Sequence, residues 1–191
     1  MKLCFAGLGN PGEKYSNTRH NVGFIAIDKI SSYLGIKKFN SFKDNNLLWA
    51  ETAFKNKRIY LVKPYNYMNN SGIPLKTFCS YKNISVDEVV LIYDDIDTEL
   101  GRLRIKKSGS SGGHRGVESV INAFNTTDIK RIRIGIGPKP SDKDLSSYVL
   151  SCFRDKEILL LNNVIDKLPE ILESIIERGI DYTISRYNSN T

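Results

Sequence analysis

The chain switches repeatedly between two hydrophobic periods, and each switch predicts a change of secondary structure. Continuous or alternating apolar positions, typical of strands, occupy residues 3–6, 47–54, 59–62, 89–93, 102–106 and 131–136. Apolar positions three and four residues apart, typical of helices, occupy residues 22–34, 73–81, 116–124 and 155–178. Because strands and helices interleave without a repeat or a low-complexity linker, the pattern predicts one α/β domain over residues 1–191.

Proline, glycine and small polar residues set the expected ends of these elements. Asn70 or Ser71 is expected to cap the helix that follows. Pro169 should kink or divide the long C-terminal helix, and Gly179 should stop it. The last residues, 188–191, are polar and are expected to fray.

The loop between the first strand and the first helix holds a concentration of polar residues. Three glycines and a proline keep residues 7–20 out of regular structure. Asn10 and His20 therefore lie at the carboxyl end of a strand, where α/β proteins commonly place their chemistry. His20 is one of only two histidines in the chain.

The glycines of this loop also fit the dinucleotide-binding pattern G-x-G-x-x-G. That pattern requires its third glycine to open a helix and an acidic residue to end a second strand. Here polar residues follow Gly12, and the nearest suitable acid, Asp28, falls inside the predicted helix. We therefore expect no cofactor, and a nucleotide-dependent oxidoreductase is only a secondary alternative.

Charge and cysteine content narrow the class of protein. The formal net charge of +7 favours a polyanionic partner. Cys4, Cys79 and Cys152 are widely spaced in apolar surroundings, without a C-x-x-C pair. We interpret them as reduced core cysteines of a cytosolic protein, neither disulfide-bonded nor metal ligands. The apolar runs are too short to span a bilayer, and no signal peptide is visible.

Loops after the predicted strands gather polar residues suited to hydrolysis: Asn10, His20, Asn69 or Asn70, Asp94 and His114. A histidine held by a carboxylate can act as a general base on water, because the carboxylate fixes its tautomer. Asparagine amides can hold a carbonyl or a developing oxyanion. The sequence has no nucleophile elbow and no histidine pair with zinc-ligand spacing, so these residues predict direct activation of water without a metal.

Residues 7–24, GLGNPGEKYSNTRHNVGF, resemble the signature of the bacterial peptidyl-tRNA hydrolase family. Further similar blocks follow in the family's order at residues 63–72, 94–97, 112–114 and 131–137. Together they extend over about residues 1–150. The resemblance implies a monomeric, cytoplasmic, single-domain α/β/α sandwich of three layers with a mostly parallel mixed sheet. The implied reaction is hydrolysis of the ester between a peptide and the 3′-terminal ribose of tRNA, which frees the tRNA for translation.

The resemblance also implies roles for individual residues. His20 corresponds to the general base and Asp94 to the residue that orients it. Asn10 and Asn69 correspond to residues that hold the peptide and the terminal adenosine. Residues of the cleft wall are Tyr15, Tyr67 and Met68. Arg133 and Lys106 correspond to tRNA contacts at the acceptor stem and 3′ end, and charge alone adds Lys107, Lys139 and Lys143.

One position departs from the family pattern. After Gly112-Gly113-His114 the best-known members have asparagine, whereas this chain has Arg115. Arginine cannot accept a hydrogen bond, but it can donate several and can contact phosphate. We assign His114 and Arg115 to substrate binding. A structural role for His114, a mobile lid at residues 138–150 and a non-catalytic RNA-binding relative of the same fold remain as alternatives.

Overall fold

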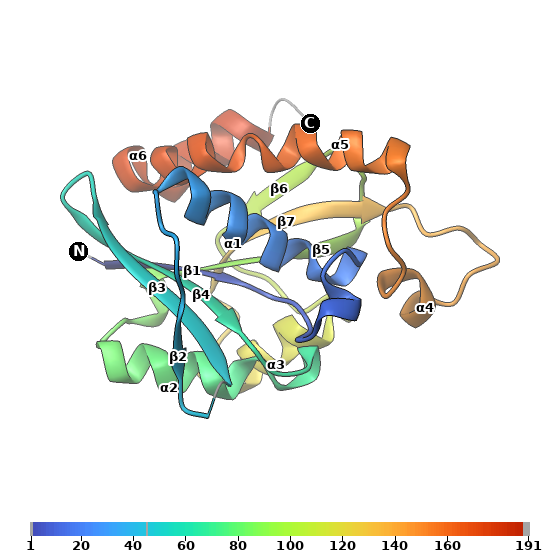
Figure 1. Ribbon diagram of the computed structural model, residues 1–191. Helices are drawn as coiled ribbons and strands as arrows, with labels where there is room; N and C mark the ends of the chain where they lie inside the picture. Colours follow the sequence, from blue (N-terminus) through green and yellow to red (C-terminus); the bar gives the residue numbers. More distant parts are fainter. Residues whose placement is uncertain (1, 45, 189–191) are drawn as a thin grey trace.

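The computed structural model describes residues 2–44 and 46–188, arranged around one seven-stranded sheet (Figure 1). Its strands are β1 (Lys2–Gly7), β2 (Asn40–Phe42), β3 (Leu47–Phe54), β4 (Lys57–Pro64), β5 (Val89–Glu99), β6 (Leu103–Lys106) and β7 (Lys130–Gly137). They lie in the order β2-β3-β4-β1-β5-β7-β6. The central strands β4, β1, β5 and β7 are parallel, whereas β3 and β6 run against them.

Helices cover both faces of the sheet. They are α1 (Val22–Tyr33), α2 (Gly72–Lys82), α3 (Arg115–Phe124), α4 (Leu145–Val149), α5 (Asp155–Ile165) and α6 (Leu168–Asn188). Short 3₁₀ helices are η1 (Glu13–Tyr15), η2 (Arg19–Asn21), η3 (Met68–Asn70) and η4 (Val86–Glu88). One face carries α1, α5 and α6 and the other carries α2 and α3 (Figure 1). The predicted three-layer α/β fold with a mixed sheet is confirmed.

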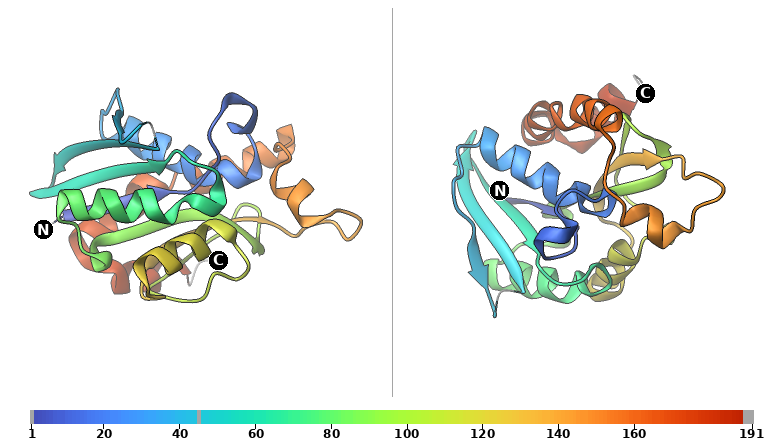
Figure 2. Two further views of the ribbon diagram at one scale, coloured as in Figure 1. Left: turned by 90° about the horizontal axis from the view of Figure 1, so that it is seen from below. Right: turned by 45° about the vertical axis from the view of Figure 1, so that its right-hand side comes forward.

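The first strand shows why both layers are needed. Leu3 and Phe5 belong to the core under α1 and α6, while Cys4 and Ala6 belong to the core under α2 and α3. Successive side chains of a strand point to opposite faces, so a continuous apolar run must be covered on both sides. Helix α4 lies beyond the end of the sheet, as the two views of Figure 2 show, and its Tyr148 joins the core under α1 and α6.

One strand extends further than expected from the sequence, whereas the two expected breaks in the C-terminal helix are present. The buried strand predicted at 89–93 continues as β5 to Glu99. The expected division near Pro169 is present, because α5 ends at Ile165 and α6 begins at Leu168. The predicted stop at Gly179 is confirmed, because its non-helical backbone, with φ 82° and ψ 172°, separates two helices that α6 joins across a kink. Beyond it Ile180 is buried again, so packing favours resumption of the helix.

Two predictions are wrong, one about the cap of helix α2 and one about the C-terminal end of the chain. Ser71 lies at the N-cap of α2, but its hydroxyl donates to the carbonyl of Met68. The hydroxyl of Ser119 accepts the Gly72 N–H instead. Asn188, expected to fray, hydrogen-bonds both the N–H and the carbonyl of Ile105 through its side-chain amide. The other residues of that expectation, 189–191, lie outside the described residues.

The cysteine prediction holds for two of the three thiols. Cys4 and Cys79 are buried and free, whereas Cys152 is free and exposed, so its expected place in the core is wrong. Its backbone pairs with Thr18, and its carbonyl accepts a hydrogen bond from Arg19. Backbone pairing therefore holds this segment against the loop after β1 without burying the side chain.

Helix α1 lies in backbone contact with the sheet at Gly23. A Cβ atom at this position would lie 2.4 Å from the carbonyl oxygens of both Ile92 and Leu8. This approach carries His20, just before α1, towards Asp94, just after Ile92 on β5. A residue without a side chain is therefore required where the two elements meet.

We predict that Gly23→Ala lowers the free energy of unfolding by about 1–3 kcal/mol, because the added methyl group overpacks this contact. The loss should appear although alanine favours helix formation by about 1 kcal/mol over glycine. Urea denaturation measures the change. Ser32→Ala, on the exposed side of the same helix, is the control and should change stability by less than about 0.5 kcal/mol. Equal stability of Gly23→Ala and the wild type would show that the close contact is not required.

Candidate active site

A cleft of about 440 Å³ opens at the carboxyl ends of the central parallel strands. Its walls come from the loop after β1, from η3, from the end of β5, from the loop before α3 and from α4. Of the residues predicted for the site, those on this cleft are Asn10, Tyr15, His20, Tyr67, Met68, Asn69, Asp94, His114, Arg115 and Arg133. The fold therefore assembles groups from distant parts of the sequence.

The buried carboxylate of Asp94 lies at the centre of this cleft. His20 Nδ1 is 2.9 Å from both Oδ1 and Oδ2 of Asp94. His114 Nε2 is 2.9 Å from Oδ1. Pairing of β5 with β1 ends at Ile92, which leaves room beside Asp94 for the loop that carries His20. Only 4% of Asp94 is exposed, so the two imidazoles replace water as its hydrogen-bond partners.

The contacts of His114 fix its tautomer. The N–H of Val117 donates to His114 Nδ1 at 3.2 Å and thereby caps α3. Nδ1 must therefore be unprotonated, and Nε2 carries the hydrogen that Asp94 accepts. In the same way His20 donates from Nδ1 to Asp94, which leaves its Nε2 with a free lone pair. The arrangement supplies one oriented base at the cleft.

Opposing effects determine the protonation state of Asp94. Burial raises the pKa of its carboxyl group, but the electrostatic interactions and hydrogen bonds with His114 and His20 lower it more. The net pKa lies below the ordinary range of an aspartate. Asp94 therefore stays ionised and can stabilise positive charge on an imidazole.

His20, Asp94 and His114 also present ligand atoms within 4.8 Å of one another, as a metal site would. Coordination through His114 Nε2 requires loss of its hydrogen. Nδ1 cannot take up that hydrogen while it faces the N–H of Val117. The donor set therefore fits a hydrogen-bonded carboxylate better than a cation.

Asn10 is held by three hydrogen bonds. Its Oδ1 accepts from the N–H of Met68 at 2.8 Å, and its own N–H donates to Asn21 Oδ1 at 2.9 Å. Asn21 Nδ2 donates in turn to the carbonyl of Asn10 at 3.0 Å. The amide NH₂ of Asn10 is thus the group left for a bound molecule. Asn21 is a positioning residue that sequence reasoning missed, although it directly follows His20.

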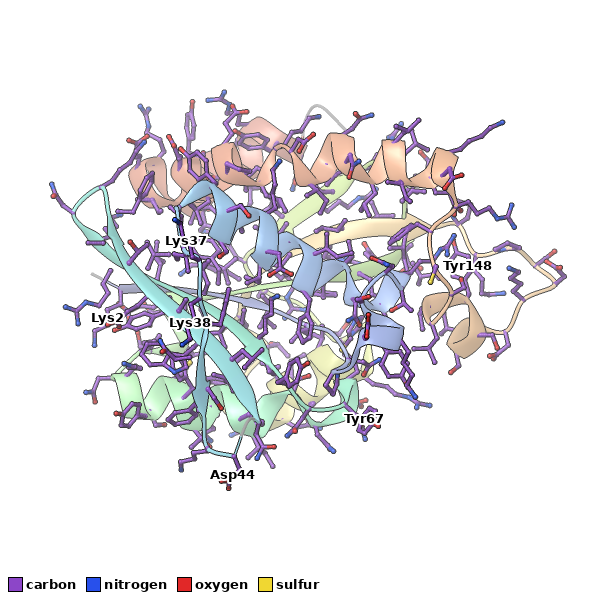
Figure 3. The ribbon with its side chains drawn as sticks, in the orientation of Figure 1. Lys2, Lys37, Lys38, Asp44, Tyr67 and Tyr148 are labelled. Atoms are coloured by element: carbon purple, nitrogen blue, oxygen red, sulfur yellow. The ribbon has the colours of Figure 1, made fainter. Side chains whose placement is uncertain are left out.

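The aromatic side of the cleft combines packing with exposure. Met68 is buried, and a Cβ atom at Gly116 would lie 2.4 Å from its sulfur. Tyr67 next to it is 59% exposed, at the same side of the molecule as Tyr148 of α4 (Figure 3). Asn69 is also exposed, on η3. Met68 therefore contributes to both the core and the cleft.

Two acidic residues that follow Asp94 in β5, Asp95 and Asp97, are an ion-pair partner and a solvated side chain. Asp95 accepts hydrogen bonds from Thr98 Oγ1 and, at 2.8 Å, from the guanidinium of Arg133. Asp97 is exposed. Arg133 therefore lines the cleft while it is engaged in an ion pair.

Four lysines assigned to tRNA binding do not line this cleft: Lys106, Lys107, Lys139 and Lys143. Lys107 pairs with Asp181 of α6 at 2.5 Å. Lys139 donates to the carbonyls of Pro140 and Lys143. Lys143 lines a neighbouring hollow of about 160 Å³ that also contains Arg19. Any contact that these lysines make with a substrate lies outside the cleft.

Arg131 is a charged residue in a buried environment. Alternation along β7 places it on the same face as Arg133, but only 1% of it is exposed. Its guanidinium donates to the carbonyls of Ser110, Thr127 and Ile129. The side chain thus lies beneath the loop that leads into His114 and α3 and holds that loop against β7.

Comparison with known proteins gives consistent results over the whole chain. The family model described as peptidyl-tRNA hydrolase matches residues 4–191. A protein named peptidyl-tRNA hydrolase from Fervidobacterium nodosum is 46% identical over 98% of this chain and 96% of its own length. A protein of the same name from Thermotoga maritima is 43% identical over 98% of this chain and 97% of its own length. The crystal structure of peptidyl-tRNA hydrolase from Acinetobacter baumannii superposes with a TM-score of 0.89 at 26% identity, covering 97% of this chain and 94% of that chain.

We predict that Asn21→Ala lowers the free energy of unfolding by about 1–3 kcal/mol, because it leaves the buried backbone groups of Asn10 without partners. Urea denaturation measures the loss. Asn17→Ala, an exposed asparagine in the same loop, is the control and should lie within about 0.5 kcal/mol of the wild type. Equal effects of the two substitutions would contradict the positioning role.

We predict that the stability contribution of Asp94 depends on pH. Because its folded pKa is lowered, the unfolded chain binds more protons between the folded and the ordinary value. The contribution is complete above the ordinary carboxyl pKa of about 4 and is lost as the pH falls towards the folded value. Urea denaturation measures the free energy of unfolding of the wild type and of Asp94→Asn between pH 6 and pH 3. The difference between the two proteins should shrink as the pH falls. A constant difference between the two proteins would refute this coupling.

Proposed function

This chain belongs to the peptidyl-tRNA hydrolase family, and we propose that His20 and Asp94 perform the hydrolysis in its cleft. The chain is a hydrolase whose substrate is peptidyl-tRNA, and it cleaves the ester between the peptide and the 3′-terminal ribose. The observation that carries the mechanism is the pairing of His20 Nδ1 with the buried Asp94 carboxylate, because it leaves His20 Nε2 as a free base.

His20 acts first as a base and then as an acid. Its Nε2 takes a proton from a water molecule while the water oxygen attacks the ester carbonyl carbon. The ionised Asp94 stabilises the imidazolium that forms. When the tetrahedral intermediate collapses, the ester C–O bond breaks and the imidazolium returns the proton to the ribose oxygen. The products are a peptide carboxylic acid and free tRNA.

Amide groups bind the reacting end of the substrate. The NH₂ group of Asn10, fixed through Asn21, donates to the ester carbonyl and to the oxyanion that develops from it. Asn69 binds the peptide and the terminal adenosine from η3. Tyr15, Tyr67 and Met68 provide the apolar wall beside these groups. His114 orients Asp94 from the side opposite to His20.

The polyanionic part of the substrate binds outside the reacting centre. Basic residues proposed to contact the acceptor stem and 3′ end are Arg133, Lys106, Lys107, Lys139 and Lys143. The net charge of +7 supports this assignment, because cations that neutralise phosphates release counterions.

We further propose that the chain acts as a monomer in the cytoplasm. Among the described residues, no helix is long and apolar enough to cross a membrane.

The geometry disfavours the two alternative functions. A relative that only binds RNA has no need of an ionised carboxylate between two oriented imidazoles. A dinucleotide site needs a helix to begin at the third glycine of its pattern. Gly12 is instead followed by the 3₁₀ helix η1, and α1 begins only at Val22.

We predict that His20→Ala reduces the release of peptide from N-acetylaminoacyl-tRNA by about 10²–10⁴-fold, because it removes the general base. The affinity for uncharged tRNA, measured under the same conditions, should stay within about threefold. Asn17→Ala, in the same loop, is the control and should cleave as the wild type does. If the wild type bound tRNA but released no peptide, the chain would be a binding-only relative.

A further inference from the structure

Arg115 is the one arginine of the cleft wall without an ion pair among residues 2–44 and 46–188. The cleft is lined by two arginines, Arg115 and Arg133. Arg133 donates to Asp95 at 2.8 Å. Arg115 is exposed at the start of α3, and its side chain makes no hydrogen bond or ion pair with any described residue. Its guanidinium is therefore available to an anionic ligand.

The charges around Arg115 make this availability significant. Four carboxylates line the same cleft, from Asp94, Asp95, Asp97 and Asp144, against the two arginines. Asp97 and Asp144 are exposed, so they repel an RNA backbone that enters the cleft. The cleft wall offers free positive charge to such a backbone only at Arg115, within the part of the chain described.

The exposure of the Arg115 side chain, and its lack of a partner among the described residues, indicate which kind of anion Arg115 binds. Stabilisation of an oxyanion requires donors that are held in place before the reaction. An exposed arginine without a second partner is not held in this way. A phosphodiester carries a permanent charge, and its oxygens match the planar fork of a guanidinium. Phosphate binding in the ground state therefore fits Arg115 better than transition-state stabilisation.

The position of Arg115 selects one phosphodiester of the substrate. It directly follows His114, whose Nε2 lies 2.9 Å from Asp94 Oδ1 at the reacting centre. In the substrate, the permanent charge nearest to the ester is the phosphodiester on the 5′ side of the terminal nucleoside. We propose that Arg115 binds this phosphodiester and so positions the 3′ end for His20. This inference rests on the proposed function.

Two small ester substrates test the proposal. One is the N-acetylaminoacyl ester of adenosine, which has no phosphate, and the other is the same ester of the dinucleotide CpA, which has one phosphodiester. A neutral amino acid is used in both, so that no acidic side chain competes for Arg115. We expect Arg115→Gln to raise KM for the CpA ester about tenfold, the usual scale of a charge-assisted hydrogen bond. KM for the adenosine ester and kcat for both should change less than about twofold.

Two further variants sharpen the comparison. Arg115→Lys keeps the positive charge but lacks the planar, two-pronged guanidinium. Its KM for the CpA ester should lie between those of the wild type and Arg115→Gln. Arg58→Gln removes one exposed positive charge near the start of β4, at the opposite end of the sheet. This variant should leave KM and kcat for both esters unchanged at physiological ionic strength, because charges more than about 8 Å apart are then largely screened.

The outcomes separate this inference from the proposed function. Equal losses on the two esters, or a loss in kcat alone, would place Arg115 at the ester or the peptide and overturn the phosphate assignment. No loss on either ester would overturn it as well. Should the small esters turn over too slowly, their inhibition constants against N-acetylaminoacyl-tRNA cleavage serve as the same comparison. A wild type that cleaves neither the esters nor the tRNA would refute the proposed function itself.

Discussion

The site depends on one buried carboxylate that two imidazoles share. Asp94 is almost completely withdrawn from water, yet its pKa stays below the ordinary range, because His114 and His20 offset its burial. Without either partner the ionised carboxyl group would lose a hydrogen bond that no solvent replaces. The elements around it are arranged to deliver these two rings. Gly23 brings α1 and the preceding His20 against β5, and the N-cap of α3 brings His114 from the other side.

The capping contact of His114 couples local structure to chemistry. The N–H of Val117 needs an acceptor at the helix start, and His114 Nδ1 supplies it. That same contact leaves the proton on Nε2, where Asp94 accepts it. Formation of the first turn of α3 therefore selects the tautomer that the site requires. A serine or aspartate would cap the helix as well, but neither would extend a second hydrogen bond to Asp94 in this geometry.

Local patterns predict the elements and the polar residues that follow them, but not the environment of each side chain. The spacing around residues 7–24 placed Asn10 and His20 correctly on the loop after β1. Strand alternation placed Arg131 and Arg133 on one face, but it carries no information about what covers that face. The carbonyls that bury Arg131 belong to loops before α3 and β7. The exposure of Cys152 likewise depends on pairing with Thr18, a contact between distant segments.

The distribution of charge agrees with the proposed mechanism. A general base must gain a proton during the reaction, and a fixed cation beside it would oppose that gain. The chain carries +7 overall, yet carboxylates outnumber arginines on the cleft wall. Arg133 is neutralised by Asp95, and the charge of Arg115 is carried on a long, exposed side chain. In the proposed mechanism the outer surface attracts the polyanion, while His20 stays beside the negative charge of Asp94. The proposed RNA contacts and the proposed activation of water are thus separated in space within one small domain.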